Sequence, residues 1–246
     1  MEKGHIVSAF DQELGGLTNV IMEMGGIAEA QLADAIQAVA TRDIDLAEKV
    51  VAQDKRVDQL EAEVDAAAIQ MLALRQPMAG DLRQVVTALK VSHMVERIAD
   101  YAKNIARRAT VLSQLPPIQP RQSIPRMGRL AQQQLKDVLD AYVKRDADRA
   151  IAVWQRDREL DELYEALFRE VLTYMMEDPR NITAGTHVLF MAKNIERIGD
   201  HATNVAEMVY FLVHGEPLQE SRPKGNRTSL TVVEPQGGSA TASEPE

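Results

Sequence analysis

Residues 95–104 read VERIADYAKN, and residues 195–204 read IERIGDHATN. Both stretches contain Glu-Arg-Ile followed by a small residue and Asp, and both end in Asn. A second matching pair lies upstream, where residues 42–47 read RDIDLA and residues 145–150 read RDADRA. The offset is close to 100 residues in both pairs, so the chain contains two copies of one unit. Two copies are too few for a stacked solenoid and favour a pseudo-symmetric pair of bundles.

Each copy has the apolar spacing of long amphipathic helices. Val91, Ile98 and Ile105, for example, recur every seven residues along one face. The chain is rich in Ala, Leu, Arg, Met, Gln and Glu, which lose little on entering a helix. We therefore predict an all-α fold of two tandem, pseudo-symmetric three-helix bundles. Its six long helices are expected at 8–40, 43–74, 81–113, 124–143, 146–177 and 181–214.

Two segments divide the chain. Residues 114–125 contain four prolines, which lack an amide donor and disfavour helix in the preceding residue. After Pro217, Gly, Pro, Ser, Thr and Glu predominate, and such a segment cannot bury enough apolar surface to offset its chain entropy. We therefore expect a first repeat at 1–113, a Pro-rich linker at 114–124, a second repeat at 125–216 and a disordered tail at 217–246.

Composition excludes several classes of function. The sequence has no cysteine, so disulfides and thiolate metal sites are excluded. No apolar run approaches the roughly 20 residues that cross a bilayer, and no signal peptide is visible, so a cytoplasmic protein is expected. The formal net charge of −9 disfavours direct binding of nucleic acid, which requires clustered Lys and Arg. No Gly-rich phosphate loop or nucleophile–base constellation occurs, and we expect no enzymatic activity.

Acidic residues recur at helical spacing in both repeats. With Ile98 at the centre of the buried face, Glu96 and Asp100 lie on the opposite side of the same helix. Glu196 and Asp200 repeat this arrangement in the second half. Because neighbouring helices of a bundle pack closely, we expect the acids of the second helix to join them on the bundle surface. Those acids are Asp54, Asp58, Glu61 and Asp65 in the first repeat, with Asp157 and Asp161 in the second.

The acidic rows have two interpretations. Charged strips on helices are commonly solvated faces. Alternatively, a cation bridges like charges that otherwise destabilise a helix at i,i+4, and carboxylates select hard cations such as Mg²⁺, Mn²⁺ or iron. The two halves also differ, since Tyr164 and Phe168 stand where the first half has two further acids. His93 lies three residues before Glu96, but its counterpart is Lys193, so the repeat does not support a ligand role for it.

Further segments carry a resemblance to a known family. Besides the two Glu-Arg-Ile-(Ala/Gly)-Asp motifs, they are Met22-Glu23-Met24-Gly25-Gly26, Arg75-Gln76-Pro77, Asp81-Leu82-Arg83 and Tyr174-Met175-Met176-Glu177-Asp178. With these motifs the chain resembles the PhoU family of phosphate-transport accessory proteins, from about His5 to Glu216. The resemblance implies two side-by-side three-helix bundles and a homodimer.

The resemblance also implies a function and a set of metal ligands. It implies a non-enzymatic negative regulator of the phosphate-starvation response that links the ATPase subunit of the phosphate ABC transporter to a sensor histidine kinase. Association with the membrane would be peripheral, through these partners. Family members bind metal through E-x-x-x-D and D-x-x-x-D motifs, which implies a divalent or trivalent ion (Mg, Mn, Fe or Zn) whose identity stays open. The implied ligands are Asp54, Asp58, Glu96, Asp100, Asp157, Asp161, Glu196 and Asp200.

Three other classes of protein are alternatives to this interpretation. A di-iron carboxylate oxidase also uses a helical bundle, but it needs Glu-x-x-His on two helices, and no such pair occurs. A histidine phosphotransfer module would use His93 as the phosphate acceptor. A structural coiled coil is disfavoured by the Pro-rich break and by the duplication.

Overall fold

The computed structural model describes residues 2–220, with side chains from Phe10 onward, and every regular element in this range is a helix. The first unit contains α1 (Glu2–Thr41), α2 (Ile44–Arg75) and α3 (Gly80–Ser113). The second contains α4 (Ile124–Lys144), α5 (Ala147–Gln155), α6 (Asp157–Glu177) and α7 (Ile182–His214). Two short 3₁₀ helices, Gln119–Ser123 and Pro179–Asn181, lie in the connections.

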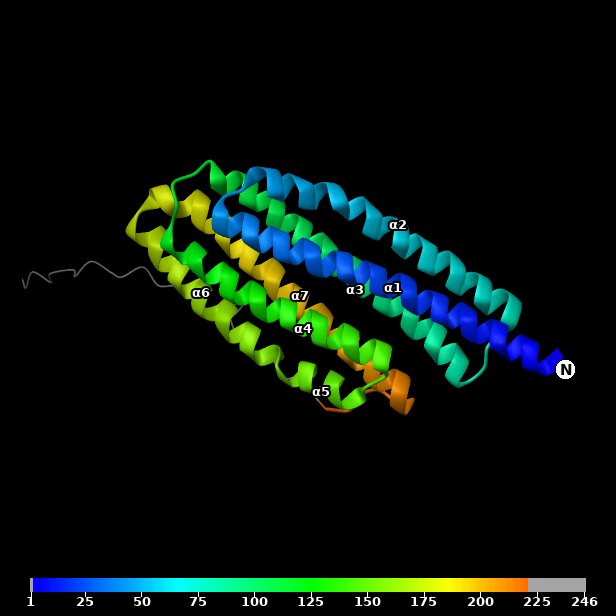
Figure 1. Cartoon of the computed structure of the whole chain (residues 1–246). Coiled ribbons are helices and arrows are strands. Elements are labelled where there is room, and N and C mark those ends of the chain that lie inside the picture. Colours follow the sequence, from blue (N-terminus) through cyan, green and yellow to red (C-terminus); the bar gives the residue numbers. More distant parts are fainter. Residues whose placement is uncertain (1, 221–246) are drawn as a thin grey trace, which may run out of the picture.

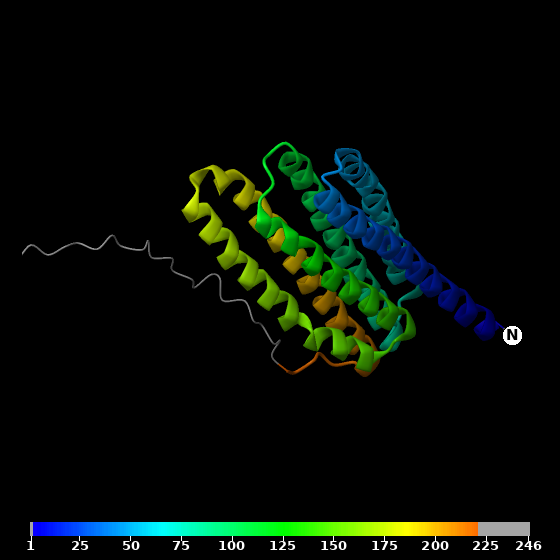
Figure 2. The ribbon, with the colours of Figure 1, turned by 60° about the vertical axis from the view of Figure 1, so that its left-hand side comes forward.

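The two units lie side by side as elongated bundles (Figures 1 and 2). In the first, α1, α2 and α3 all contact one another, and in the second α7 contacts α4, α5 and α6. The units join mainly through α3 against α7, with α1 against α4. The predicted pair of three-helix bundles is confirmed. As a consequence α3 is covered by α1, α2 and α7, which leaves little of its surface open to solvent.

One predicted helix is broken in the structure. The segment expected as a single helix at 146–177 turns at Arg156, where α5 ends and α6 begins. The carbonyl oxygen of Arg156 accepts a hydrogen bond from Gln134 Nε2 of α4 at 3.1 Å, and its guanidinium donates to Asp137 Oδ2 at 3.0 Å. Because these partners come from another helix, the periodicity of residues 146–177 contains no sign of the break.

The repeated Arg-Asp pairs are helix–helix turns. Arg42 and Arg145 adopt left-handed backbone conformations with φ of 61° and 51°. The next residue in each case, Asp43 or Asp146, caps the following helix by accepting a hydrogen bond from a backbone amide at 2.9 or 3.0 Å. A left-handed residue ends one helix and an Asp N-cap begins the next, which explains why this pair recurs at the same place in both units.

Small residues bring the two units close together. A side-chain carbon added at Gly128 of α4 would lie 2.5 Å from Ile36 of α1, and one added at Gly25 of α1 would lie 2.6 Å from Leu139 of α4. The contact between α1 and α4 therefore depends on glycine in each helix. By contrast, Gly26 faces open space.

The linker is partly built into the fold. Ile118 and Pro120 are buried, and the 3₁₀ turn leads directly into α4. Of the predicted disordered tail at 217–246, residues 221–246 lie outside the described residues. None of the helices within residues 2–220 combines the length and apolarity that crossing a bilayer requires.

Candidate functional site

The acids of α2 and α3 meet in one cluster, joined by a lysine. The ammonium group of Lys103 donates to both Asp54 of α2 and Asp100 of α3. Burial by itself lowers the pKa of Lys103, but its hydrogen bonds to the two carboxylates outweigh burial and hold the pKa above its ordinary value. We call this group the first acidic cluster; its members are Asp54, Asp58, Glu61, His93, Glu96, Asp100 and Lys103.

One end of the first acidic cluster has the donor types of a metal site. His93 Nδ1 lies 3.0 Å from Glu61 Oε1. A carboxylate oxygen of Glu96 joins them, and the three donor atoms lie within 4.8 Å of one another. Glu61 and Glu96 come from different helices, so it is the packing of α2 against α3 that brings the carboxylates together.

Electrostatics show that this cluster holds more negative charge than its lysine neutralises. Burial, followed by the charges of Asp100, Glu61 and Asp58, raises the pKa of Glu96 from 4.5 to about 7, against the opposing effect of Arg97. The pKa of Asp58 is also raised, first by burial and then by Asp54. At neutral pH the cluster therefore favours binding either a proton or a cation.

The second unit holds a related set of residues at the equivalent repeat positions, and more of its acids are buried. We call it the second acidic cluster; its members are Asp157, Asp161, Tyr164, Lys193, Glu196, Asp200 and Thr203. Lys193 Nζ donates to Glu196 Oε1 at 2.7 Å and lies 5.2 Å from the centre of the Tyr164 ring. Thr203 Oγ1 lies 3.2 Å from Asp157 Oδ1 and donates to it or to the Gly199 carbonyl oxygen at 2.9 Å. Asp157, Asp161 and Glu196 are buried.

The two clusters place their lysines at opposite ends. In the first, Lys103 neutralises the Asp54–Asp100 end, and the equivalent position of the second is Thr203. In the second, Lys193 neutralises Glu196, and the equivalent position of the first is His93. The duplicated sites thus have different charge distributions and need not bind the same ion with equal strength.

The prediction that the acidic rows lie on the outside of the bundle was wrong in part. Glu96 and Asp100 are half-buried between α2 and α3, while Asp54, Asp157, Asp161 and Glu196 are buried. A helical wheel centred on Ile98 assumes that one face of the helix is buried. Helix α3 is instead covered from three directions, so the side opposite Ile98 turns toward α2 rather than water.

Some members of the clusters were not predicted, and two predicted acids of α2 are exposed. Lys103 and Thr203 gave no signal as single residues, although Lys103 follows Asp100 by three positions, a spacing at which helical side chains meet. Asp58 and Asp65, expected in the same strip, are both exposed on α2. His93 joins Glu61 and Glu96 even though the repeat offered no support for it.

Comparison with known proteins identifies the family of this chain. The PhoU domain model matches residues 21–109 and again residues 124–209, which are the two structural units. The chain belongs to the PhoU family. A relative from Caulobacter vibrioides, named phosphate-specific transport system accessory protein PhoU homolog, is 56% identical over 221 residues, covering 89% of this chain and 96% of the relative. A homolog of the same name from Zymomonas mobilis is 48% identical over 219 residues, covering 89% and 92%.

Solved PhoU structures share the fold. The crystal structure of PhoU from Pseudomonas aeruginosa superposes with a TM-score of 0.81 at 38% identity, covering 84% of this chain and all of that one. The metal binding that the family likeness implies can therefore be tested against the donor set of this chain. In the first acidic cluster, carboxylates from two helices and one imidazole come together, so these residues fit hard or borderline cations. In the second unit, among the described residues, no three such donors lie as close together.

Proposed function

We propose that this chain is a non-enzymatic accessory regulator of phosphate uptake and a negative regulator of the phosphate-starvation response. It would act in the cytoplasm as a homodimer, contacting the ATPase subunit of the phosphate ABC transporter and a sensor histidine kinase, and would reach the membrane through these partners. The observation that carries the proposal is the similarity to phosphate-specific transport system accessory protein homologs, which covers 89% of this chain.

The two acidic clusters would give this regulator its metal sites. Asp54, Asp58, Glu96 and Asp100 would hold an ion in the first unit, with Glu61 and His93 beside them. Asp157, Asp161, Glu196 and Asp200 would hold one in the second. A bound divalent or trivalent cation would neutralise carboxylates that otherwise repel one another. The chain's own lysines stabilise the same carboxylates without metal, so binding would compete with Lys103 and Lys193.

The placement of His93 favours this role over phosphotransfer. A phosphoryl donor carries negative charge, and His93 lies against Glu61 within a group of carboxylates. Repulsion between these charges disfavours the approach of such a donor. Incubating the protein with phosphorylated kinase domains and finding no phosphohistidine at position 93 supports the accessory role, whereas transfer at His93 refutes it.

Deletion of the gene tests the regulatory role. In phosphate-rich medium, loss of a negative regulator should raise alkaline phosphatase activity, and a plasmid copy should restore repression. Unchanged repression in the deletion strain would refute the proposal.

A matched pair of variants tests the acidic clusters. The first variant replaces Glu96, Asp100, Glu196 and Asp200 with Ala. The control replaces Glu13, Glu23, Asp34 and Glu63, which form surface ion pairs on the first unit, and so changes the net charge by the same amount. Pull-down from phosphate-replete cells should recover the transporter ATPase or the kinase with the control and lose it with the first variant. If both variants recover the partner equally, the acidic clusters are not needed for partner binding.

A further inference from the structure

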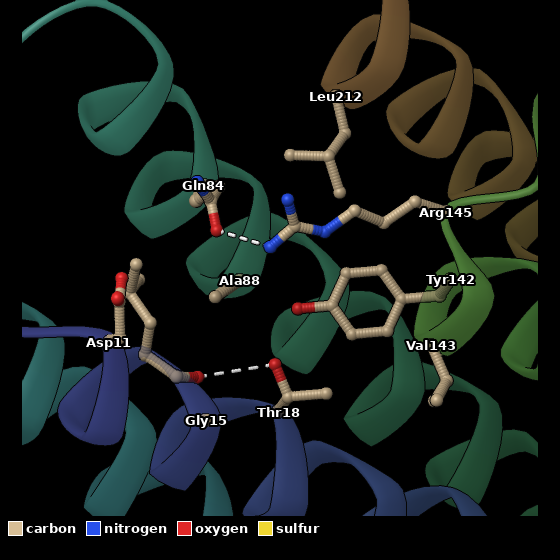
Figure 3. A pocket seen from close by; sticks show the side chains of 10 residues that line it. Asp11, Gly15, Thr18, Gln84, Ala88, Tyr142, Val143, Arg145 and Leu212 are labelled. Atoms are coloured by element: carbon tan, nitrogen blue, oxygen red, sulfur yellow. Dashed lines mark hydrogen bonds between the residues drawn. The ribbon is translucent and has the colours of Figure 1, made fainter. Parts of the chain in front are cut away.

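A polar cleft lies at the junction of the two units, away from the acidic clusters. It has a volume of about 300 Å³ and is lined from α1 by Asp11 and Thr18, from α3 by Gln84, and from α4 by Tyr142 and the adjoining Arg145 (Figure 3). That volume is at the lower end of the range for small-molecule sites. On α3 the cleft reaches no farther than Ala88, about 12 Å along the helix axis from Glu96.

Arg145 stands out when it is compared with its counterpart in the first unit. Arg42 occupies the equivalent left-handed position, and its guanidinium donates to the carbonyl oxygens of Ser113 and Leu115 at 2.5 and 2.7 Å. It therefore caps the C-terminal end of α3, which is a structural role. By repeat symmetry Arg145 would cap the end of α7. Instead it extends into the cleft, where Nη2 donates to Gln84 Oε1 at 2.5 Å.

Another arginine already occupies the end of α7. The guanidinium of Arg83 lies where a side-chain carbon at position 215 would stand, and its Cζ lies 6.0 Å from the centre of the Phe211 ring. Arg83 fills the space at the end of α7, and Arg145 contacts Gln84 instead of performing the role of Arg42. Among the side chains of residues 10–220, no carboxylate forms an ion pair with Arg145, and the hydrogen bond of its guanidinium goes to a neutral amide.

The remaining lining groups indicate what kind of anion the cleft suits. The hydroxyl groups of Thr18 on α1 and Tyr142 on α4 point toward each other near Arg145, and Thr18 also donates to the Leu14 carbonyl oxygen at 3.2 Å (Figure 3). Leu14, Val143 and Leu212 add apolar surface. Asp11 on the α1 side accepts hydrogen bonds and repels a second negative charge. A guanidinium fork suits a carboxylate or phosphate group. An anion with hydroxyl groups could reach these hydroxyls as well as Arg145, whereas a bare ion has no hydroxyl group of its own to offer them.

We propose that this cleft binds a small hydroxylated organic anion, with its phosphate or carboxylate group on Arg145 and its hydroxyl groups toward Thr18, Tyr142 and Asp11. A sugar phosphate and a hydroxycarboxylic acid share this chemistry. Because the ligand would touch α1, α3 and α4 together, its binding would stabilise the junction between the two units. The inference goes beyond the proposed regulatory function and does not depend on metal binding.

Isothermal titration calorimetry on the full chain tests the site with three probes: glycerol 3-phosphate, malate and inorganic phosphate. The test variant is Arg145→Gln, and Gln tolerates the left-handed conformation because Gln76 adopts it with φ of 46°. The matched control is Arg42→Gln, which removes the equivalent arginine of the first unit. Circular dichroism spectra establish that both variants are folded.

We expect glycerol 3-phosphate or malate to bind the native protein, and Arg145→Gln to weaken that binding by about tenfold or more, since a charged hydrogen bond is lost. Arg42→Gln should leave the affinity within about twofold, because a distant site acts independently. The proposal is overturned if neither organic anion binds, if Arg145→Gln binds as tightly as the native protein, or if inorganic phosphate binds as tightly as the organic probes.

Discussion

Replacing Lys103 with Met removes the one positive charge that joins α2 to α3 in the first acidic cluster. The ammonium group contacts Asp54 and Asp100, and the exposed fractions of the three side chains are only 16%, 8% and 27%. Methionine keeps most of the apolar stem of the lysine, so the change tests charge more than packing. Without the ammonium group, the buried carboxylate of Asp54 has lost its cationic partner.

The structure sets the expected size of this effect. Breaking a buried ion pair from one side costs about 3–5 kcal/mol, and we expect about 3 kcal/mol here because Asp100 is partly hydrated. For a chain of this length that corresponds to a fall in melting temperature of about 6–12 °C. The pKa of Lys103 is raised in the folded state, so its contribution is complete below the ordinary value of 10.5 and is lost only as the pH rises through the higher folded value.

Urea denaturation of metal-free protein at pH 7 measures the loss of unfolding free energy in Lys103→Met, with Lys49→Met as the control. Lys49 lies 3.5 Å from Asp34, but its side chain is 59% exposed, so removing that pair should cost less than about 1 kcal/mol. Adding Mg²⁺ or Mn²⁺ should restore more stability to Lys103→Met than to the native protein, because the cation then meets no competing ammonium group. The electrostatic reasoning is refuted if Lys103→Met loses no more stability than Lys49→Met.

Three further changes test other parts of the structure. Because the pKa of Glu96 is raised to about 7, the folded state binds a proton that the unfolded state releases near 4.5. The unfolding free energy of metal-free protein should therefore fall as the pH rises from 5 to 7. Glu96→Gln should flatten this slope in urea titrations. Gly128→Ala should destabilise the protein by about 1–3 kcal/mol through collision with the stiff Ile36 side chain, whereas Gly26→Ala should stabilise it by up to about 1 kcal/mol in thermal melts. Arg42→Gln removes two hydrogen bonds at the end of α3 and should cost about 2 kcal/mol, measured as a lower urea midpoint at constant slope.

The spacing of the acidic residues places each acid on a definite side of its own helix, α2 or α3, and this much can be read from the sequence. The meeting of Asp54 with Asp100 follows from that spacing once the helices are neighbours. Lys103 was not predicted because a single lysine on a helix has many solvent-exposed alternatives. Its role depends on the two carboxylates that the packing brings within its reach.

The linear order of residues determined the duplication, the helices and most of their ends. Apolar periodicity, the prolines after Ser113 and the two Asp N-caps act over a few neighbouring residues, so their effect is encoded in each segment alone. Packing decided how deeply the acidic rows are buried, where the helix breaks at Arg156, and which different partners Arg42 and Arg145 bind. Each of these depends on contacts between helices distant in the chain, and such contacts follow from the shape and charge of all the surfaces together, which no short pattern records.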